Sequence, residues 1–91
     1  MKRAVKVNIY GRVQGVGFRY FAAREAKLLG ITGYVRNLMD GSVEVFAQGE
    51  DSLINSYIII LKDGPRFGKV RDIQVANQSS QELYNDFTVK Y

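Results

Sequence analysis

The chain has 91 residues, of which 46% are hydrophobic and 24% charged, and these values are typical of one globular domain. It contains no cysteine and no histidine, which excludes disulfides, thiolate nucleophiles and histidine as a general base or metal ligand. The formal net charge of +4 favours anionic partners. Because no apolar stretch approaches the roughly 20 residues that span a bilayer, and because cysteine is absent, we expect a cytoplasmic protein with no membrane partner.

The first thirty residues predict a strand, a glycine-rich loop and a helix. Residues 4–10 alternate between apolar and polar side chains, which indicates a half-buried strand. Three glycines lie within residues 11–17, which we call the glycine-rich loop. From residue 18 to residue 29 the apolar side chains recur with a helical period, and Gly30 follows where a helix C-terminal glycine is common.

The middle of the chain predicts a β-hairpin and a second helix. Residues 32–38 and 42–48 have the pattern of strands, and Asp40-Gly41 between them is typical of a tight turn. A helix is expected to begin at residue 51 or 52, although the apolar run at residues 58–61 also fits a buried strand.

The last third predicts two further strands and completes the fold class. Gly64-Pro65 ends the helix, and strands are expected at residues 70–76 and 87–91, separated by a polar stretch at residues 77–82. The order is βαββαβ with an extra C-terminal strand. It predicts one α+β domain over residues 1–91, a ferredoxin-like sandwich with two helices on one face of an antiparallel sheet. Since this fold carries many functions, the site must decide the activity.

The glycine-rich loop and the start of the following helix have the composition of an anion site. Glycines permit positive φ angles and a close approach of the backbone to a ligand, so that successive N–H groups can converge on an anion. The helix start adds free N–H groups and the positive end of the helix dipole. Arg19, in the first helical turn, can bind two phosphate oxygens with its planar guanidinium.

The loop by itself leaves the function open. It lacks the Gly-Lys-Ser/Thr ending of a nucleotide P-loop and the G-x-G-x-x-G order of a dinucleotide-binding loop. A flexible strand–helix connection with an incidental surface arginine fits the glycines equally well.

Two longer blocks of sequence are more specific. The first is Gly-Arg-Val-Gln-Gly-Val-Gly-Phe-Arg at residues 11–19, and the second is Gly-Tyr-Val-Arg-Asn at residues 33–37, followed by Asp-Gly-Ser-Val at residues 40–43. With these blocks, and with Gly49 and Gly64-Pro65, the chain resembles the acylphosphatase family over nearly its full length. Some members carry a bulkier residue where this chain has Gly17, a difference expected to affect loop stiffness more than chemistry.

The resemblance implies an enzyme that hydrolyses the carboxyl–phosphate bond of acyl phosphates, with Arg19 and Asn37 as catalytic residues. Arg19 would bind the phosphate together with the backbone N–H groups of Gln14, Gly15, Val16, Gly17 and Phe18. Asn37, close to Arg19 in the fold of the family, would position the attacking water. From its place before a turn alone, Asn37 would more simply be a hairpin cap.

This chemistry suits a chain without histidine or cysteine. A carboxylate leaves without a proton from a general acid, and phosphoryl transfer depends chiefly on positioning and charge stabilisation. The nine acidic residues show no spacing typical of metal ligands, so we expect no metal and no other cofactor. The expected partners are a small acyl phosphate and inorganic phosphate, which would compete with it.

Two other functions fit parts of the sequence. An RNA-binding module would share the fold and the basic charge, but the third strand, residues 42–48, offers one aromatic residue and one acid, so we expect no nucleic-acid partner. A non-catalytic or carrier-like relative of the acylphosphatase domain, as found within larger carbamoyl-transfer proteins, would carry the same two blocks. The short chain favours the separate enzyme.

Overall fold

The computed structural model describes residues 1–79 and 83–91. In chain order the described elements are β1 (Lys2–Arg12), α1 (Phe18–Leu28), β2 (Thr32–Asn37), β3 (Val43–Glu50), α2 (Asp51–Asp63), β4 (Lys69–Gln78) and β5 (Phe87–Lys90). Each predicted element is therefore present. Three strands, β1, β3 and β4, run longer than their apolar alternation suggested, because backbone pairing continues into polar residues, and β4 takes in residues 77–78 of the predicted polar break. The other two, β2 and β5, each end one residue earlier than expected. Residues 80–82 of that break lie outside the described residues.

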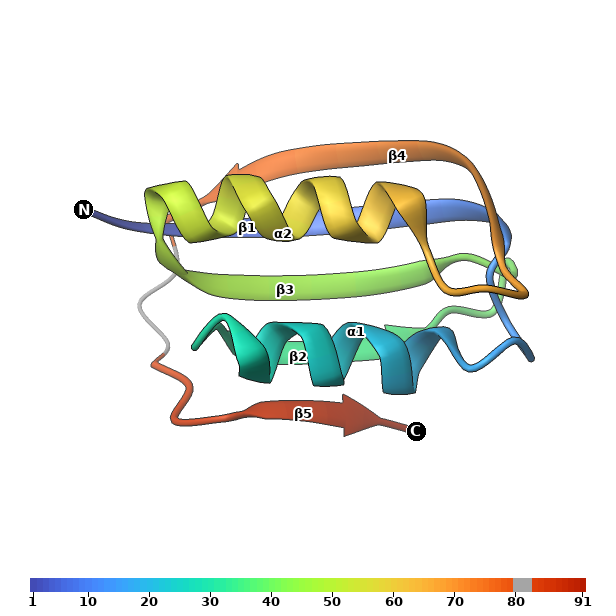
Figure 1. Cartoon of the computed structure of the whole chain (residues 1–91), viewed down its shortest axis with the longest axis horizontal. Coiled ribbons are helices and arrows are strands. Elements are labelled where there is room, and N and C mark those ends of the chain that lie inside the picture. The colour runs from blue at the N-terminus through green and yellow to red at the C-terminus, as the bar shows by residue number, and fades with distance from the viewer. Residues whose placement is uncertain (80–82) are drawn as a thin grey trace.

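The strands form one sheet in the order β4-β1-β3-β2-β5, and both helices cover the same face of it (Figure 1). β3 is central and pairs antiparallel with β1 and with β2, while β1 also pairs antiparallel with β4. This arrangement confirms the ferredoxin-like α+β fold.

The C-terminal strand makes the sheet mixed, where an antiparallel sheet was expected. β5 pairs parallel to β2, with Val35 opposite Val89. The reason is visible in Figure 1: β4 ends at one end of the sheet, and β5 begins at that same end and runs beside β2 in the same direction. Which strand β5 would join could not be predicted from its four residues.

The core lies between the helices and the sheet. Val5, Val7 and Ile9 of β1 point into it and are fully buried, as their alternation predicted. On α2 the buried residues are Ile54, Tyr57 and Leu61, a spacing of three and four residues that only a helix places on one face. Ile59 on the same helix is 68% exposed. The alternative of a buried strand at residues 58–61 is therefore wrong.

The opposite face of the sheet carries an aromatic cluster. Tyr34 and Phe46 stack with ring centroids 5.8 Å apart, and Tyr84 lies 5.4 Å from Phe46. Beside them, Arg36 forms an ion pair of 2.9 Å with the buried carboxylate of Glu44. Since Phe46 is only 5% exposed, the third strand presents no open ring on which a base could stack.

Candidate active site

The glycine-rich loop leaves β1 at Arg12 and enters α1 at Phe18. Gly15 and Gly17 adopt φ angles of 74° and 77°, which residues other than glycine rarely adopt. A Cβ atom at either position would meet no atom within 4 Å, so the backbone conformation, and not lack of space, requires glycine there. The open space beside both residues leaves the backbone accessible to a ligand.

The start of α1 offers N–H groups that no side chain caps. Gly17 is the N-cap residue, it forms no side-chain capping bond, and the first turn of the helix contains no acidic residue. The first N–H groups of a helix have no partner within the helix and need one from elsewhere. With the positive end of the helix dipole, these N–H groups favour an anion at this position.

The loop is anchored from both sides. Val13 before it and Phe18 after it are buried in the core. The side-chain amide of Gln14 donates to the backbone oxygens of Leu38 and Ser42, at 2.8 and 2.9 Å. These two oxygens belong to the turn between β2 and β3, so Gln14 joins the glycine-rich loop to the turn that follows Asn37.

The turn itself is stabilised by Asp40. Its carboxylate accepts hydrogen bonds from the backbone N–H and the hydroxyl of Ser42. These bonds lower the pKa of Asp40 below its ordinary value. Asp40, and not Asn37, is therefore the capping residue of this hairpin.

Arg19 is half-buried in the first turn of α1 and is held by the C-terminal segment. Its Nη1 donates to the backbone oxygen of Lys90 at 3.4 Å, and its guanidinium carbon lies 4.6 Å from the centroid of the Tyr91 ring. None of the ion pairs found among residues 1–79 and 83–91 involves Arg19. Its charge and most of its five N–H donors are thus available to a ligand.

Asn37 is the last residue of β2 and lines the same pocket as Arg19. The pocket has a volume of about 220 Å³ and is lined by Val13, Gly15, Gly17, Phe18, Arg19, Tyr20, Asn37, Val89 and Tyr91. The side-chain oxygen of Asn37 is buried and has no hydrogen-bond partner in the described part of the chain. Buried amide oxygens are normally paired, so this oxygen is left for a partner that the chain itself does not supply.

The structure brings most of the predicted site residues together. Gly15, Gly17, Phe18, Arg19 and Asn37 all line the pocket, although Arg19 and Asn37 are 18 positions apart in the sequence. Gln14 and Val16 do not line it. The Gln14 side chain serves as the anchor described above, and Val16 packs against the core.

The sequence did not predict which residues contact Arg19, nor that the Gln14 side chain would anchor the loop to the β2–β3 turn. Lys90 and Tyr91 reach Arg19 only because β5 pairs with β2, and no local pattern encodes that pairing. The sequence carries only a weak indication of the hydrogen bonds of Gln14. An amide side chain in a loop of glycines needs hydrogen-bond partners if it is buried, but the sequence does not say which ones.

Comparison with known proteins decides the family. The family model described as Acylphosphatase matches residues 5–89, which is nearly the whole chain. The chain belongs to the acylphosphatase family. Acylphosphatases hydrolyse acyl phosphates, so the chain is a hydrolase of this class.

Similar acylphosphatases extend over the full length of the chain. The acylphosphatase of Thermotoga petrophila is 43% identical over 89 residues, which are 98% of this chain and 98% of that protein. The crystal structure of acylphosphatase from Bacillus subtilis superposes with a TM-score of 0.94 at 40% identity and covers 100% of both chains.

The acylphosphatase fold also forms part of a larger protein. Full-length HypF, in its phosphate- and nucleotide-bound form, matches with a TM-score of 0.88 and 30% identity, and covers 100% of this chain but 12% of its own. The chain is thus similar to separate acylphosphatases and to one segment of a much longer protein.

This acylphosphatase has neither a cluster of acidic side chains nor a membrane-spanning helix in the part of the chain that the structure describes. Among the described residues, no three acidic side chains gather where they could bind a metal ion. Neither helix in the described part has the length and apolar character needed to cross a membrane.

A larger hollow of about 430 Å³ lies at the other end of the sheet, where β1 begins and β3 ends. It is lined in part by Arg3, whose guanidinium already donates to Asn55 and Asn77. Arg3 also pairs with Asp51 at 3.5 Å, and the hollow is lined by no residue of the glycine-rich loop or of α1.

Proposed function

We propose that this acylphosphatase binds the phosphoryl group of its substrate between the glycine-rich loop, the start of α1 and Arg19, and that Asn37 positions the water that attacks phosphorus. The observation that carries the proposal is the shared pocket, in which an arginine without an acidic partner faces the same space as an asparagine with an unpaired amide oxygen. The uncapped N–H groups of α1 border this space.

The reaction exchanges one phosphorus–oxygen bond for another. The water oxygen forms a bond to phosphorus while the bond from phosphorus to the carboxyl oxygen breaks. The electron pair of that bond leaves with the carboxylate, one water proton stays on inorganic phosphate, and the other passes to solvent. Because the carboxylate is already a stable anion, no general acid is needed, and a chain without histidine or cysteine can carry out the step.

The protein contributes charge and position. Negative charge is spread over the three non-bridging phosphoryl oxygens in the transition state, and Arg19 with the loop N–H groups would stabilise it in a partly water-excluded site. The Asn37 amide has one donor end and one acceptor end, so it can bind a water and orient its lone pair. These groups supply the positive charge without a metal ion, so we predict that the reaction proceeds without one.

The experiment that tests the proposal is the hydrolysis of acetyl phosphate by the purified protein in excess chelator, with inorganic phosphate added in steps. We expect full activity in chelator, and we expect phosphate to raise the apparent KM while kcat stays unchanged. Loss of activity in chelator that magnesium restores would overturn the metal-independent reaction. A KM unaffected by millimolar phosphate would overturn the anion site.

The cellular location is a separate prediction. The absence of cysteine fits a reducing compartment, and we infer the cytoplasm.

A further inference from the structure

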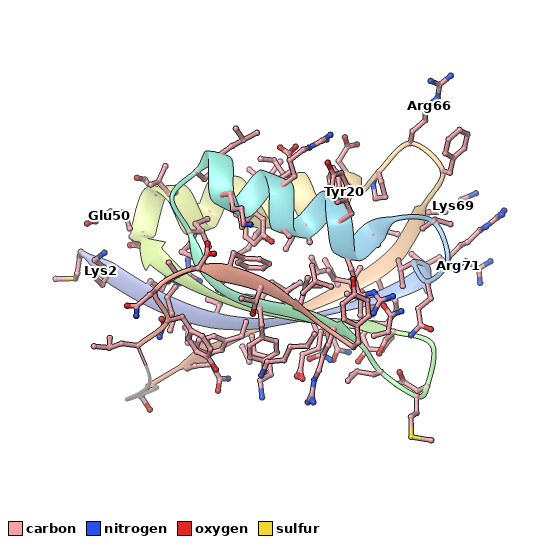
Figure 2. The ribbon with its side chains drawn as sticks, turned by 90° about the horizontal axis from the view of Figure 1, so that it is seen from below. Lys2, Tyr20, Glu50, Arg66, Lys69 and Arg71 are labelled. Carbon is pink, nitrogen blue, oxygen red and sulfur yellow. The ribbon has the colours of Figure 1, made fainter. Side chains whose placement is uncertain are left out.

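Four exposed cations gather at the end of the sheet that carries the pocket. We call them the basic rim: Arg12, Arg66, Lys69 and Arg71. In Figure 2, Arg66, Lys69 and Arg71 extend from one end of the molecule, whereas Lys2 and Glu50 lie at the other end. The rim has no part in binding the phosphoryl group as proposed above, because none of its members lines the pocket.

The basic rim borders the glycine-rich loop. Arg12 is the last residue of β1 and the second residue of the glycine-rich loop. The turn that carries Arg66 packs on the loop, because a Cβ atom at Gly68 would lie 3.3 Å from Val16. Rim and pocket are therefore neighbouring parts of one surface.

The charges of the rim are uncompensated. No ion pair among the described residues involves any of its four members. The nearest acids along the chain are Asp63 and Asp72, both exposed, and the Asp72 carboxylate accepts a hydrogen bond from the N–H of Ile73. Four cations against these two acids leave the rim positive.

The rim also brings like charges together in the sheet. Lys69 lies directly opposite Arg12 in the register of β4 and β1. Arg71 is the extra residue where the register shifts between Tyr10 and Gly11. Like charges directly opposite one another destabilise a sheet, and bulges are common beside active sites. Stability alone does not favour this arrangement.

We propose that the basic rim selects substrates by charge, favouring acyl phosphates whose acyl group carries a further negative charge. The proposal rests on the proposed function of the neighbouring pocket. A positive surface beside a binding site raises the local concentration of anions, and the gain grows with the charge of the anion. The phosphoryl group supplies the same charge in every acyl phosphate, so the rim distinguishes substrates through the acyl group.

The test compares succinyl phosphate, which has a terminal carboxylate, with acetyl phosphate, which has a neutral acyl group. The measured quantity is the ratio of the two kcat/KM values for the wild type and for the double variant Arg66→Gln/Lys69→Gln. We expect the variant to lower this ratio by about threefold or more at low ionic strength. The difference between wild type and variant should vanish at about 0.5 M salt, where the Debye length falls to a few ångströms.

The matched control removes two exposed lysines away from the rim, Lys2→Gln/Lys27→Gln. This control changes the net charge by the same amount as the rim variant, but away from the pocket. Its ratio of the two kcat/KM values should therefore stay near that of the wild type. Removal of Lys69 also relieves its repulsion with Arg12, so the rim variant should unfold at the same temperature as wild type or above it.

The outcomes separate the two proposals. Equal ratios in wild type, rim variant and control, with acetyl phosphate still hydrolysed, would overturn the role of the rim and leave the proposed function standing. Hydrolysis of neither substrate by the wild type would overturn both. An unchanged ratio together with strong inhibition by short single-stranded DNA, lost in the rim variant, would assign the rim to a polymeric anion and contradict the selection of substrates.

Discussion

Arg19 has one guanidinium nitrogen bound to the Lys90 oxygen and its guanidinium carbon over the Tyr91 ring, and its remaining donors are free to bind phosphate. We expect it to bind the phosphoryl group in both the ground state and the transition state. Arg19→Ala should therefore raise KM by roughly tenfold or more and also lower kcat, because a charge-assisted hydrogen bond contributes about 1.5–3 kcal/mol. Arg19→Lys keeps the charge but loses the planar fork and should remain badly impaired.

Steady-state kinetics and calorimetric titration with inorganic phosphate test both Arg19 variants. Arg19→Lys is the control that separates charge from geometry. Near wild-type kinetics of Arg19→Ala would contradict the role of Arg19, and near wild-type kinetics of Arg19→Lys alone would show that a point charge is sufficient.

Asn37 differs from Arg19 because we expect it to contact the attacking water and not the phosphate. Asn37→Ala should lower kcat by roughly 10²-fold while the affinity for inorganic phosphate stays near that of wild type, by comparison with the loss of one preorganised polar group in other enzymes. The measurement is kcat by steady-state kinetics, with the phosphate Kd by titration.

Stability provides the control for Asn37. Loss of a capping side chain typically costs about 1 kcal/mol, but Asp40 caps this hairpin and the Asn37 oxygen has no partner to lose. The free energy of unfolding of Asn37→Ala should thus stay close to the wild-type value. A folded Asn37→Ala protein that turns over like wild type would show that Asn37 does not position the water.

At the scale of elements, the hydrogen bonds of Gln14 connect the glycine-rich loop to the β2–β3 turn. Gln14→Met keeps the length of the side chain and removes both donors. We expect weaker phosphate binding, because the loop then loses its fixed position relative to Asn37. Two lost hydrogen bonds should also reduce the free energy of unfolding by about 1–3 kcal/mol.

Urea unfolding and phosphate titration of Gln14→Met measure the two effects. A variant that loses stability but keeps the wild-type phosphate Kd would show that Gln14 supports the fold and not the anion site.

The two helices are joined by Tyr57, whose hydroxyl donates to the Ala22 oxygen at 2.8 Å inside the core. Burial raises the pKa of Tyr57 well above its ordinary value, so the phenol stays neutral across the physiological range. Tyr57→Phe should cost about 1 kcal/mol and lower Tm by about 4–8 °C, since the chain is short. The kcat at 25 °C should not change, because neither Tyr57 nor Ala22 lines the pocket. Differential scanning calorimetry and the acetyl phosphate assay check this, and an unchanged Tm would mean that the bond adds no net stability.

On the scale of the whole molecule, local sequence patterns predicted the helices and strands. They did not predict which strands pair across long stretches of the chain, such as β5 with β2. The apolar alternation located β1 and the helical period located α1, because both patterns reflect which side chains of the element face the core. The run at residues 58–61 was ambiguous, since four consecutive apolar residues carry no period until the buried Ile54 and Tyr57 are known.

The residues of the candidate site also differ in whether the sequence could predict them. Arg19 and the glycines could be predicted because they lie in one continuous segment, and Asn37 only through the resemblance to a family. Lys90 and Tyr91 could not be predicted at all. They reach Arg19 because β5 lies beside β2 as the last strand of the sheet, a contact across more than 70 residues.

The central claim is that water attacks phosphorus in a site built from Arg19, Asn37 and the glycine-rich loop, and oxygen-18 labelling tests it most directly. Acetyl phosphate is hydrolysed by the protein in labelled water with excess chelator, and the products are analysed by mass spectrometry after subtraction of the uncatalysed reaction. Attack at phosphorus predicts one labelled oxygen in inorganic phosphate and none in acetate. Label in acetate would mean that water attacks the carbonyl carbon, and would contradict the proposed reaction.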